Sequence, residues 1–368
     1  MTEIDKGSLF KFLNFIENKL ESKKTYIYGA GTYGKIIGSF LKKHQINYEG
    51  FIDSNKKLMG SFLFEKQIYG LSDISEYSNC VVILSLSRQV YGQEFDDLYL
   101  MLSSKGVNKE NIVYFADDFD LMNSIISSVK DTSHILQRNL KLKNIFSGRR
   151  CFIIGNGPSL LIEDINRLKT EISMGCNGIY QLFEKSVWRP TCFFAEDNVF
   201  LNEHVQTDKD LNYLLCNCEY LFTTLWSELY DRYTNKYDKL FYLHTCKTVI
   251  EDIMFSPDLT QKIYSALTTL YTMLQVAVYM GINEIYLLGI DFSFKREIDK
   301  NGYMLVREDI KNHAEIMEET DGIYHTDMIL KGYMVAKEYA DLHGIKIYNA
   351  TRGGKLEVFE RVNFDNLF

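Results

Sequence analysis

The ten residues from Cys151 to Leu160, which read CFIIGNGPSL, constrain the fold of this chain more than any other stretch. The first four carry no charge and predict a buried strand, and helical spacing resumes after Leu160, so the glycine-containing segment between them must turn sharply. A strand, a glycine turn and a helix start together bring backbone N–H groups and a helix N-terminus to a phosphate. Asn156 and Ser159 would add side-chain hydrogen bonds. A purely structural turn has the same local pattern, so its context must decide.

Composition limits the classes of protein to consider. Of 368 residues, 46% are hydrophobic and 24% charged, which is typical of a soluble globular protein with two or three domains. A net charge of -8 without a compensating basic stripe argues against a nucleic-acid partner. The 7 cysteines are scattered, which favours free thiols in a reducing cytosol. There is no signal-peptide pattern and no apolar run long enough to span a bilayer, so we expect a cytoplasmic protein.

A second glycine motif lies near the N-terminus, after a predicted strand over 25–28. Gly29, Gly31 and Gly34 form Gly-x-Gly-x-x-Gly at the start of a predicted helix, and Asp53 ends the next predicted strand about 20 residues later. This pattern predicts a Rossmann-type domain in which these four residues bind a nucleotide cofactor. The alternative is that the glycines only shape the turn and that Asp53 caps a strand.

The N-terminal region resembles the small Rossmann-like domains attached to bacterial sugar acyltransferases, sugar methyltransferases and glycan-assembly enzymes. That resemblance implies either nucleotide-sugar binding or a scaffold role. We predict three parts: a Rossmann-like domain with a leading helix over 1–118, a helical connector over 119–148, and a catalytic nucleotide-sugar-binding domain over 149–368. The basic run from Arg138 to Lys143 fits a solvated helix face better than a site.

The second half alternates strands and helices, which predicts a mostly parallel sheet with helices on both faces. We expect short strands at 213–218 and 240–243, long helices over 261–280 and 327–343, and a strand over 345–349. In open α/β sheets the ligand binds at the carboxyl ends of the strands. Polar residues recur at five of these predicted ends, namely Asn156, Asn177, Asp197, Asp291 and Asn349.

Three segments, 152–160, Cys176-Asn177 and 283–292, resemble two related bacterial groups. One group is the metal-independent sialyltransferases that use CMP-activated sialic acid. The other is the 6-hydroxymethylpterin diphosphokinase-like proteins, which include the motility-associated-factor glycosyltransferases of flagellin. The segment 347–356 is more similar to the second group. The resemblance covers about 151–360 and implies a GT-A-like fold of the sialyltransferase type.

The resemblance implies roles for particular residues. Asn156 and Ser159, together with Gly155 and Gly157, would contact the ribose and phosphate of the nucleotide, and Asn177 its cytosine or ribose. Asp291 would close the site beneath the donor. His325 occupies the place of the family's catalytic base, and a histidine suits this role because its pKa lies near neutrality. A structural histidine flanking a helix is the alternative, with His313 as the second candidate base.

A tyrosine of the loop after Asp291 would help the phosphate leave, and Tyr303 is the candidate, with Lys295 or Arg307 as a charge partner. Tyr303 could equally pack on the core. The sialyltransferases carry an arginine and a Ser-Gly pair at the start of the long helix, whereas this chain offers only Thr268 and Thr269. The missing arginine puts sialic acid itself in doubt. Arg352 would supply a cation from another direction, and we group Asp197 and Asn349 with the nucleotide-binding residues.

We therefore expect an inverting, metal-independent glycosyltransferase of bacterial surface glycan or glycoprotein assembly. Its donor would be a CMP-activated, sialic-acid-like sugar and its partner a glycan or glycoprotein acceptor. Peripheral association with the inner membrane face and a homo-oligomer stay open. One alternative is a diphosphotransferase acting on a pterin-like alcohol, with Mg²⁺ held by Glu196, Asp197 and Asp291. Another is a non-catalytic nucleotide-binding scaffold.

Overall fold

A computed structural model describes residues 3–368 except 22, 87, 89–91, 131–132, 247–249, 299–303, 315–316 and 318–323. The chain divides into two compact units, Met1–Thr132 and Ser133–Phe368. The boundary between them falls inside the predicted helical connector. The first helix of that connector packs with the first unit, and the second packs with the second unit.

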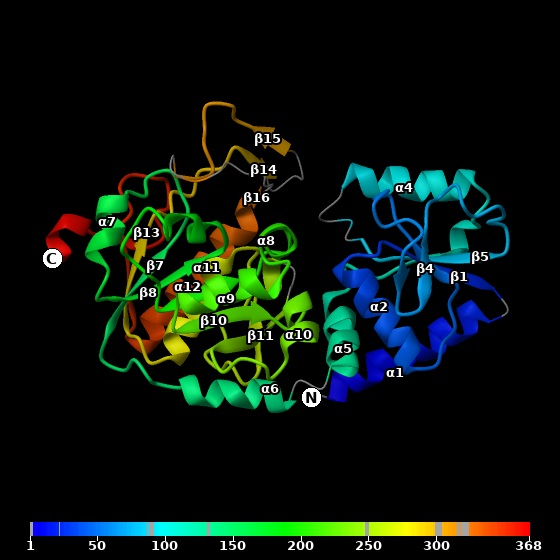
Figure 1. Cartoon of the computed structure of the whole chain (residues 1–368), viewed down its shortest axis with the longest axis horizontal. Helices are drawn as coiled ribbons and strands as arrows, with labels where there is room; N and C mark the ends of the chain where they lie inside the picture. The colour runs from blue at the N-terminus through cyan, green and yellow to red at the C-terminus, as the bar shows by residue number, and fades with distance from the viewer. Residues whose placement is uncertain are drawn as a thin grey trace. The chain divides into compact units, whose positions relative to one another are not determined.

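The first unit is one sheet covered by helices (Figure 1). The strand order is β3-β4-β2-β1-β5-β6, and all pairs are parallel except β3 with β4. The elements are α1 (Glu3–Leu20), β1 (Lys24–Tyr28), α2 (Thr32–Lys43), β2 (Gly50–Ile52), β3 (Phe62–Leu63), β4 (Lys66–Tyr69), β5 (Cys80–Leu84), α4 (Gln93–Ser104), η1 (Lys109–Asn111), β6 (Ile112–Tyr114) and α5 (Phe119–Val129).

Side chains alternate between the two faces of the sheet along β1, and helices pack on both faces. Tyr26 and Tyr28 lie in the apolar cluster formed with α4. On α1, Phe12 contacts the rings of Phe40 in α2 and Phe115, with centroids 6.0 and 4.6 Å away. The predicted Rossmann-like architecture of the N-terminal region is confirmed.

The second unit contains a larger sheet of nine strands, in the order β12-β11-β10-β9-β8-β7-β13-β17-β18, all parallel. Its strands are β7 (Arg150–Ile154), β8 (Ile172–Cys176), β9 (Cys192–Ala195), β10 (Tyr220–Thr224), β11 (Leu240–Cys246), β12 (Lys262–Tyr264), β13 (Glu284–Leu288), β17 (Lys346–Asn349) and β18 (Glu360–Arg361). Its helical segments are α6 (Ser133–Arg138), η2 (Asn139–Leu142), α7 (Ile162–Arg167), η3 (Asn177–Leu182), α8 (Asn198–His204), α9 (Asp208–Cys216), α10 (Glu228–Tyr233), η4 (Ile250–Asp252), α11 (Thr269–Tyr279), α12 (Thr326–His343) and η5 (Phe364–Leu367).

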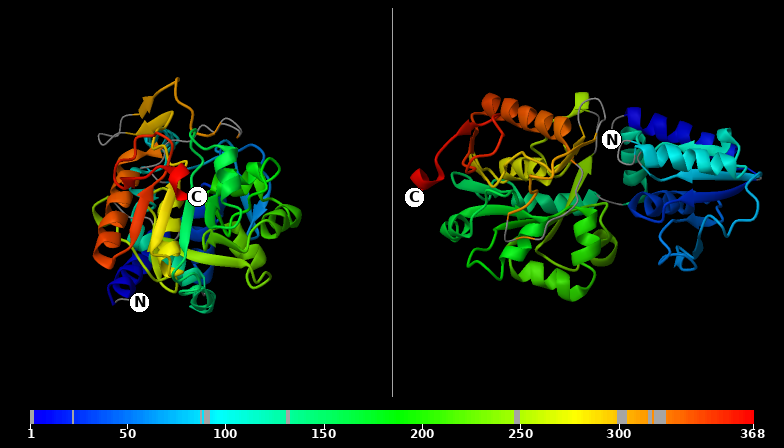
Figure 2. Two further views of the ribbon diagram at one scale, coloured as in Figure 1. Left: turned by 90° about the vertical axis from the view of Figure 1, so that its left-hand side faces the viewer. Right: turned by 90° about the horizontal axis from the view of Figure 1, so that it is seen from above.

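The central strand β7 faces a separate core on each side. Cys151 and Ile153 pack into the cluster that holds α11 and α12, whereas Phe152 and Ile154 pack into the cluster that holds η3 and α9. Figure 2 shows α12, in orange, on one side of this sheet and the green helices on the other. Because both faces are covered, the strands are apolar on both sides, which explains the uncharged run after Arg150.

The chain order reverses beside β7. From β7 the strands run outward through β8 to β12, and the chain then returns to the other side of β7 as β13 and continues to β17. The carboxyl ends of β7 and β13 therefore form a topological switch point, where open α/β sheets bind ligands.

The segment between β13 and α12 forms a three-stranded sheet of its own. It contains β14 (Arg296–Ile298), β15 (Met304–Val306) and β16 (Tyr324–His325), in the order β15-β14-β16 (Figure 1). The sequence does not predict this sheet, because strands of two or three residues show no measurable periodicity.

Two predicted elements are wrong in the second unit. The predicted strand at 213–218 lies mostly in helix α9, which a capping box of Thr207 and Asp210 opens and which buries Leu211, Leu214 and Leu215 at helical spacing. The predicted helix over 261–280 is divided: its first residues form β12, which pairs with β11, and α11 begins only at Thr269. None of the helices that the structure describes combines the length and apolar character needed to cross a membrane.

Candidate functional site

The glycine turn after β7 is bonded to the end of β13 across the switch point. The amides of Gly155 and Gly157 donate to the carbonyls of Leu288 and Gly289, at 2.8 and 2.9 Å. Beyond them, the amide and Oγ of Ser159 both donate to Oδ2 of Asp291, at 3.3 and 2.8 Å. Two residues that the sequence singles out separately, 132 positions apart, thus form one junction.

Glycine is required at this junction by close approach. A Cβ at position 157 would lie 2.0 Å from Oδ2 of Asp291 and 2.7 Å from the Gly289 carbonyl. A Cβ at position 155 would lie 2.5 Å from the same carbonyl. Neither position has room for a side chain, so the glycines predicted to bind phosphate also allow β7 and β13 to meet.

Asp291 is a buried carboxyl group with 8% of its surface exposed. Burial raises its pKa, and the two hydrogen bonds from Ser159 oppose that rise. The backbone around it is also fixed, because Lys355 donates its amide to the Asp291 carbonyl at 2.7 Å and Phe292 adopts a left-handed φ of 50°. Asp291 thus lies at the base of the junction, and its role beneath a donor stays a prediction.

Asn156 joins the glycine turn to two other segments. Its Nδ2 donates to the Cys176 carbonyl at the end of β8, at 3.3 Å. Its own carbonyl accepts the amide of Ala314, at 2.9 Å, from the segment between β13 and α12. Its Oδ1 is buried and has no hydrogen-bond partner among the described residues, so it is available to a ligand or a water molecule.

Asn177 connects the next two strand ends with α11. It follows β8 in a left-handed conformation with φ 46°, and its Oδ1 accepts the amides of Glu196 and Asp197 after β9, at 3.3 and 3.4 Å. Its Nδ2 donates to Oγ1 of Thr269, the first residue of α11, at 3.4 Å. Thr268 precedes that helix and its hydroxyl lies beside the phenol of the buried Tyr333. The structure therefore brings Asn177, Asp197 and both threonines together.

We call the residues that meet at these strand ends the switch-point site. It consists of 155–159, Asn177, Glu196 with Asp197, Thr268 with Thr269, and Asp291. Leu267, just before Thr268, also has a left-handed φ of 56°. Sparsely populated backbone conformations at Asn177, Leu267 and Phe292 thus surround one edge of the sheet, a pattern that is common at functional sites.

The candidate bases lie on the segment between β13 and α12. His325 ends β16, where it pairs with Ile298 of β14, and immediately precedes α12. His313 lies between Asn312, whose Oδ1 accepts the Lys295 amide at 2.8 Å, and Ala314, which is bonded to the glycine turn. Their roles as bases stay predictions.

The predicted leaving-group residues are placed only in part. Tyr303 lies outside the described residues. The Arg307 guanidinium forms an ion pair with Glu297, at 2.5 Å, within the small sheet. Lys295 lies just before β14, and its carbonyl accepts the Arg307 amide.

Two predicted nucleotide-binding residues have structural partners. The Nδ2 of Asn349, which is 1% exposed, donates to the Leu356 carbonyl at 2.8 Å, and its Oδ1 accepts the Thr351 amide. The Arg352 guanidinium binds Asp164 of α7, at 2.6 and 2.9 Å, and also Asp365 of η5. The Arg352 bonds join η5 near the end of the chain to α7, and the Asn349 bonds fix the turn after β17. None of these bonds is to a residue of the switch-point site.

In the first unit, the predicted cofactor residues form a closed turn. A Cβ at Gly34 would lie 1.8 Å from the Gly29 carbonyl, and Gly29 has a left-handed φ of 98°. The Asp53 carboxylate accepts the Ala30 amide at 2.8 Å. Glycines and acid therefore meet as predicted, with the acid bonded to the turn itself. Binding of a cofactor here stays a prediction.

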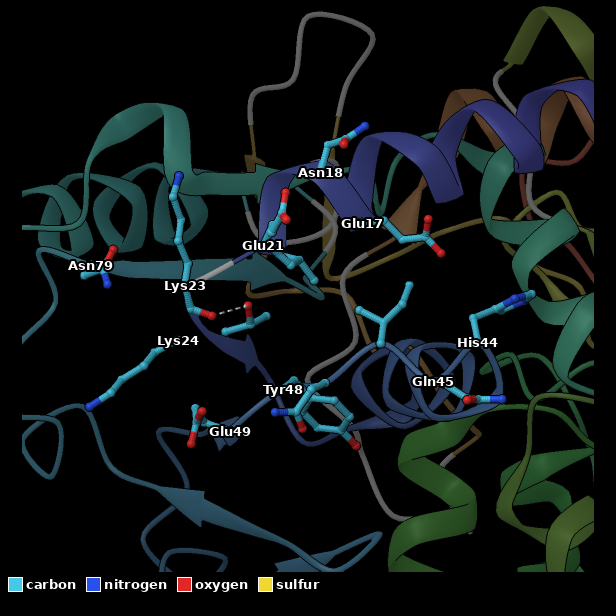
Figure 3. A pocket seen from close by; sticks show the side chains of 14 residues that line it. Glu17, Asn18, Glu21, Lys23, Lys24, His44, Gln45, Tyr48, Glu49 and Asn79 are labelled. Carbon is cyan, nitrogen blue, oxygen red and sulfur yellow. Dashed lines mark hydrogen bonds between the residues drawn. The ribbon is translucent and has the colours of Figure 1, made fainter.

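A hollow of about 800 Å³ lies at the opposite, amino edge of the first sheet (Figure 3). Its lining includes Lys24 at the start of β1, Glu49 before β2 and Asn79 before β5. It is therefore separate from the glycine turn, and its mixed charges do not converge on a single ligand chemistry.

The described residues contain no group of three or more His, Cys, Asp or Glu side chains that could hold a metal ion. Glu196 is a feature whose state the sequence does not show: burial raises its pKa to about 8. Sequence inspection also missed Thr272, which is one helical turn after Thr268 and Thr269 and so faces the same side of α11.

Comparison with known families supports the resemblance seen in the sequence. Residues 126–297 match the sequence model of the family described as 6-hydroxymethylpterin diphosphokinase MptE-like. The matched range contains the motifs at 152–160, 176–177 and 283–292 on which the predicted resemblance rests. No curated protein matches the chain in sequence.

Several solved structures align with the chain at low identity. The MAf glycosyltransferase from Magnetospirillum magneticum AMB-1 does so with 14% identity and a TM-score of 0.37, over 100% of this chain and 63% of its own length. This chain thus spans less than two thirds of that protein. The sialyltransferase CstII from Campylobacter jejuni, in complex with cytidine-5'-monophosphate, aligns with 17% identity and a TM-score of 0.33, over 59% of this chain and 85% of its own. Its complex with CMP-3FNeuAc aligns with 18% identity and a TM-score of 0.34, over 58% of this chain and 86% of its own.

Proposed function

We propose that the second unit is a glycosyltransferase that uses a CMP-activated sugar. The observation that carries this proposal is the switch-point site itself, where a phosphate-binding type of glycine turn meets a buried acid and two asparagines at adjacent strand ends. The motifs that form it are those that resemble the CMP-dependent sialyltransferases. A sialic-acid-like sugar is the donor that this resemblance favours.

In this proposal the glycine turn and Asn156 hold the phosphate and ribose. The Oδ1 of Asn156 is buried without a partner among the described residues, so a ribose hydroxyl can donate to it. Asn177 holds the base or ribose between β8 and β9. Preorganised donors at the phosphate stabilise the charge that develops as CMP departs, which is where such a site gains most.

The remaining steps fall to residues of the segment between β13 and α12. His325 takes the proton of the acceptor hydroxyl, with His313 as the second candidate, and the sugar is transferred in one displacement with inversion. Tyr303 assists the leaving phosphate, and the reaction proceeds without a metal ion. The acceptor is a glycan or glycoprotein destined for the cell surface, and the transfer takes place in the cytoplasm.

A second candidate is a Mg²⁺-dependent diphosphotransferase, because the matching family model bears the name of a pterin diphosphokinase. It requires carboxylates that are free to bind Mg²⁺. Of the three acids concerned, Asp291 already accepts two hydrogen bonds from Ser159, and Glu196 has a pKa of about 8. These observations favour the glycosyltransferase.

Thermal stabilisation by nucleotides separates the two candidates. The purified chain is melted with CMP, CDP, UDP, ATP or NAD, each with Mg²⁺ or with EDTA. A ligand that binds only the native state raises the Tm by mass action. The proposal expects stabilisation by CMP or CDP that EDTA does not change. A response to ATP only with Mg²⁺ would instead establish the diphosphotransferase, and silence from every nucleotide would favour a scaffold.

Variants then locate the nucleotide. Asn177→Ala should abolish the response to CMP, whereas Asn235→Ala, at an asparagine with the same left-handed backbone elsewhere in the unit, should leave it intact. The base is identified by the rate at which each of two variants, His325→Asn and His313→Asn, releases CMP from a CMP-sugar. Each rate is compared with that of the parent. Equal loss of CMP binding in Asn177→Ala and Asn235→Ala would contradict this location of the nucleotide.

A further inference from the structure

Glu196 is an acid placed in an apolar position. It directly follows β9, where Cys192 and Phe194 face the core that contains α11 and α12. Because side chains alternate along a strand, Glu196 points toward that same core. The residue as a whole is partly exposed, but Oε1 of its carboxyl group is buried.

A polar group beside this carboxyl is also buried. Thr272, in the first turn of α11, has no exposed surface and its hydroxyl lies beside the Glu196 carboxyl. Within the described part of the chain, neither Oγ1 of Thr272 nor Oε1 of Glu196 has a hydrogen-bond partner. A charged carboxylate in such surroundings is costly, whereas an uncharged acid needs only a water molecule or the neighbouring hydroxyl.

The backbone of the same residue holds Asn177. The Glu196 amide donates to Oδ1 of Asn177, and Nδ2 of Asn177 reaches Thr269, on the same helix as Thr272. The side chain of Glu196 is thus an anchor between β9 and α11, and Asn177 spans the same two elements above it. The amide that orients Asn177 and the carboxyl group packed toward α11 belong to the same residue, so losing the packing of the carboxyl group would loosen the residue that holds Asn177.

We propose that Glu196 acts as an uncharged carboxylic acid that positions Asn177, so that a nucleotide binds at this edge only while Glu196 keeps its proton. Glu196 is a positioning residue in this role, since it acts through Asn177. The part that concerns the nucleotide rests on the proposed function. The uncharged state of the anchor does not, because it follows from the packing of β9 against α11.

The titratable groups around Glu196 do not compensate a negative charge. Cys176 at the end of β8 is buried, and burial raises its thiol pKa, with further contributions from Glu196 and Asp197. Asp197 is the next residue in the chain and would repel a second carboxylate. On α12, burial raises the pKa of Tyr333, so its phenol is uncharged near neutral pH. None of these groups carries a positive charge that would stabilise a carboxylate.

The first experiment follows thermal stability without nucleotide. The Tm of the parent and of Glu196→Gln is measured from pH 5 to 9, with Asp197→Asn as the neighbouring control. A buried acid with a raised pKa holds a proton that the unfolded chain releases, so the parent should lose stability relative to Glu196→Gln as pH rises from 4.5 to about 8. A constant difference across this range would overturn the proposal. If Glu196→Gln does not fold, the infrared band of a protonated carboxylic acid in the parent decides: it should disappear near pH 8, and its absence at pH 6 is the contrary result.

The second experiment measures the Kd for CMP at pH 7 and pH 9. The parent should bind about tenfold more weakly at pH 9, because the protonated fraction falls by about that factor. Glu196→Gln should change less than about threefold, and Glu196→Ala should be weaker at both pH values. Parallel behaviour of the parent and Glu196→Gln would overturn the link to Asn177. If the parent binds no CMP at pH 7, the proposed function and this link both fail, while the first experiment still decides the state of Glu196.

Discussion

The two glycine turns of this chain solve the same structural problem in different ways. Each follows the first central strand of a parallel sheet, and in each a carboxylate accepts hydrogen bonds from the turn. In the first unit the acid is Asp53, from the next strand along the chain. In the second unit it is Asp291, from beyond the switch point. In both units the acid follows a strand that pairs directly with the strand before the turn. However, β2 is the next strand along the chain, whereas β13 comes after five further strands, so only the second turn depends on a long-range contact.

The helices after the two turns differ as well. Helix α2 has 12 residues and is held by a continuous apolar face that includes Ile36, Ile37, Phe40 and Leu41. Helix α7 has six residues and is held by ion pairs with residues near the end of the chain. Asp164 pairs with Arg352, and Arg167 pairs with Asp365. A short helix buries little apolar surface, so charged contacts to another segment fix its position.

The largest expected effect comes from removing the ionic support of α7. Arg352→Met leaves the carboxylate of Asp164, which is 3% exposed, without its bidentate partner. Losing one member of a fully buried pair costs about 3–5 kcal/mol, and because the Arg352 side chain is 34% exposed we expect about 3 kcal/mol here. Urea unfolding measures the change in the free energy of unfolding. The control is Lys337→Gln, which breaks an exposed pair with Asp341 and should cost less than about 1 kcal/mol. Equal effects would show that α7 is held in some other way.

The next effect compares glycines in the two turns. Gly157→Ala places a methyl group against Asp291 and the Gly289 carbonyl, which should destabilise the chain by about 1–3 kcal/mol and weaken nucleotide binding. Gly31→Ala meets nothing within 4 Å and should stay within about 1 kcal/mol of the parent. Thermal unfolding of both variants tests this. A neutral Gly157→Ala would mean that β7 and β13 are less closely joined than described.

A third test concerns the two acids. Asp291→Asn keeps the shape of the side chain but replaces a carboxylate that accepts two hydrogen bonds from Ser159. Hydrogen bonds to a charged group are worth about 1.5–3 kcal/mol, so affinity for CMP should fall at least about tenfold. Asp53→Asn should leave the affinity unchanged. Isothermal calorimetry with CMP measures both. A loss in Asp53→Asn instead would place the nucleotide in the first unit.

The smallest effect is acid sensitivity, for which each unit has a half-buried histidine whose Nε2 is enclosed. Burial lowers the pKa of His244 to about 4 and also lowers that of His44. Because each is neutral in the folded chain, their contribution to stability is complete above pH 6.5 and is lost as pH falls toward the lowered pKa. His244→Gln should thus reduce the fall in Tm between pH 6.5 and 4 by on the order of 2 °C, and His44→Gln by less. Thermal scans across this range provide the measurement, and a larger effect of His44→Gln would contradict it.

The sequence predicted the parts of this fold that have a long, regular pattern. Both glycine turns, the central strands around them and the helix from Thr326 to His343 are confirmed, because local periodicity determines such elements. The predicted strand at 213–218 ignores the capping box that opens the helix at 208–216, and β12, which reads Lys-Ile-Tyr, is too short to show a period of its own.

The candidate site was predictable in its residues but not in its contacts. Polar residues at strand ends point to one edge of the sheet, and several of them meet there because parallel strands share it. The bond between Ser159 and Asp291 joins residues 132 positions apart, and no local pattern encodes such a pairing. Arg352 was assigned to the nucleotide from its position after Asn349, and its partner Asp164 could not be known from spacing. The protonation state of Glu196 depends on burial, which arises only from the packed structure.

The bond between Ala314 and Asn156 has a consequence for how this family of sites can diversify. It joins two main-chain groups, so any residue except proline at position 314 can make it. The segment between β13 and α12 can therefore exchange most of its side chains during evolution and still dock on the same turn. Under the proposed function, a change of acceptor through that segment need not disturb the residues proposed to hold the donor, so the two specificities can be inherited separately.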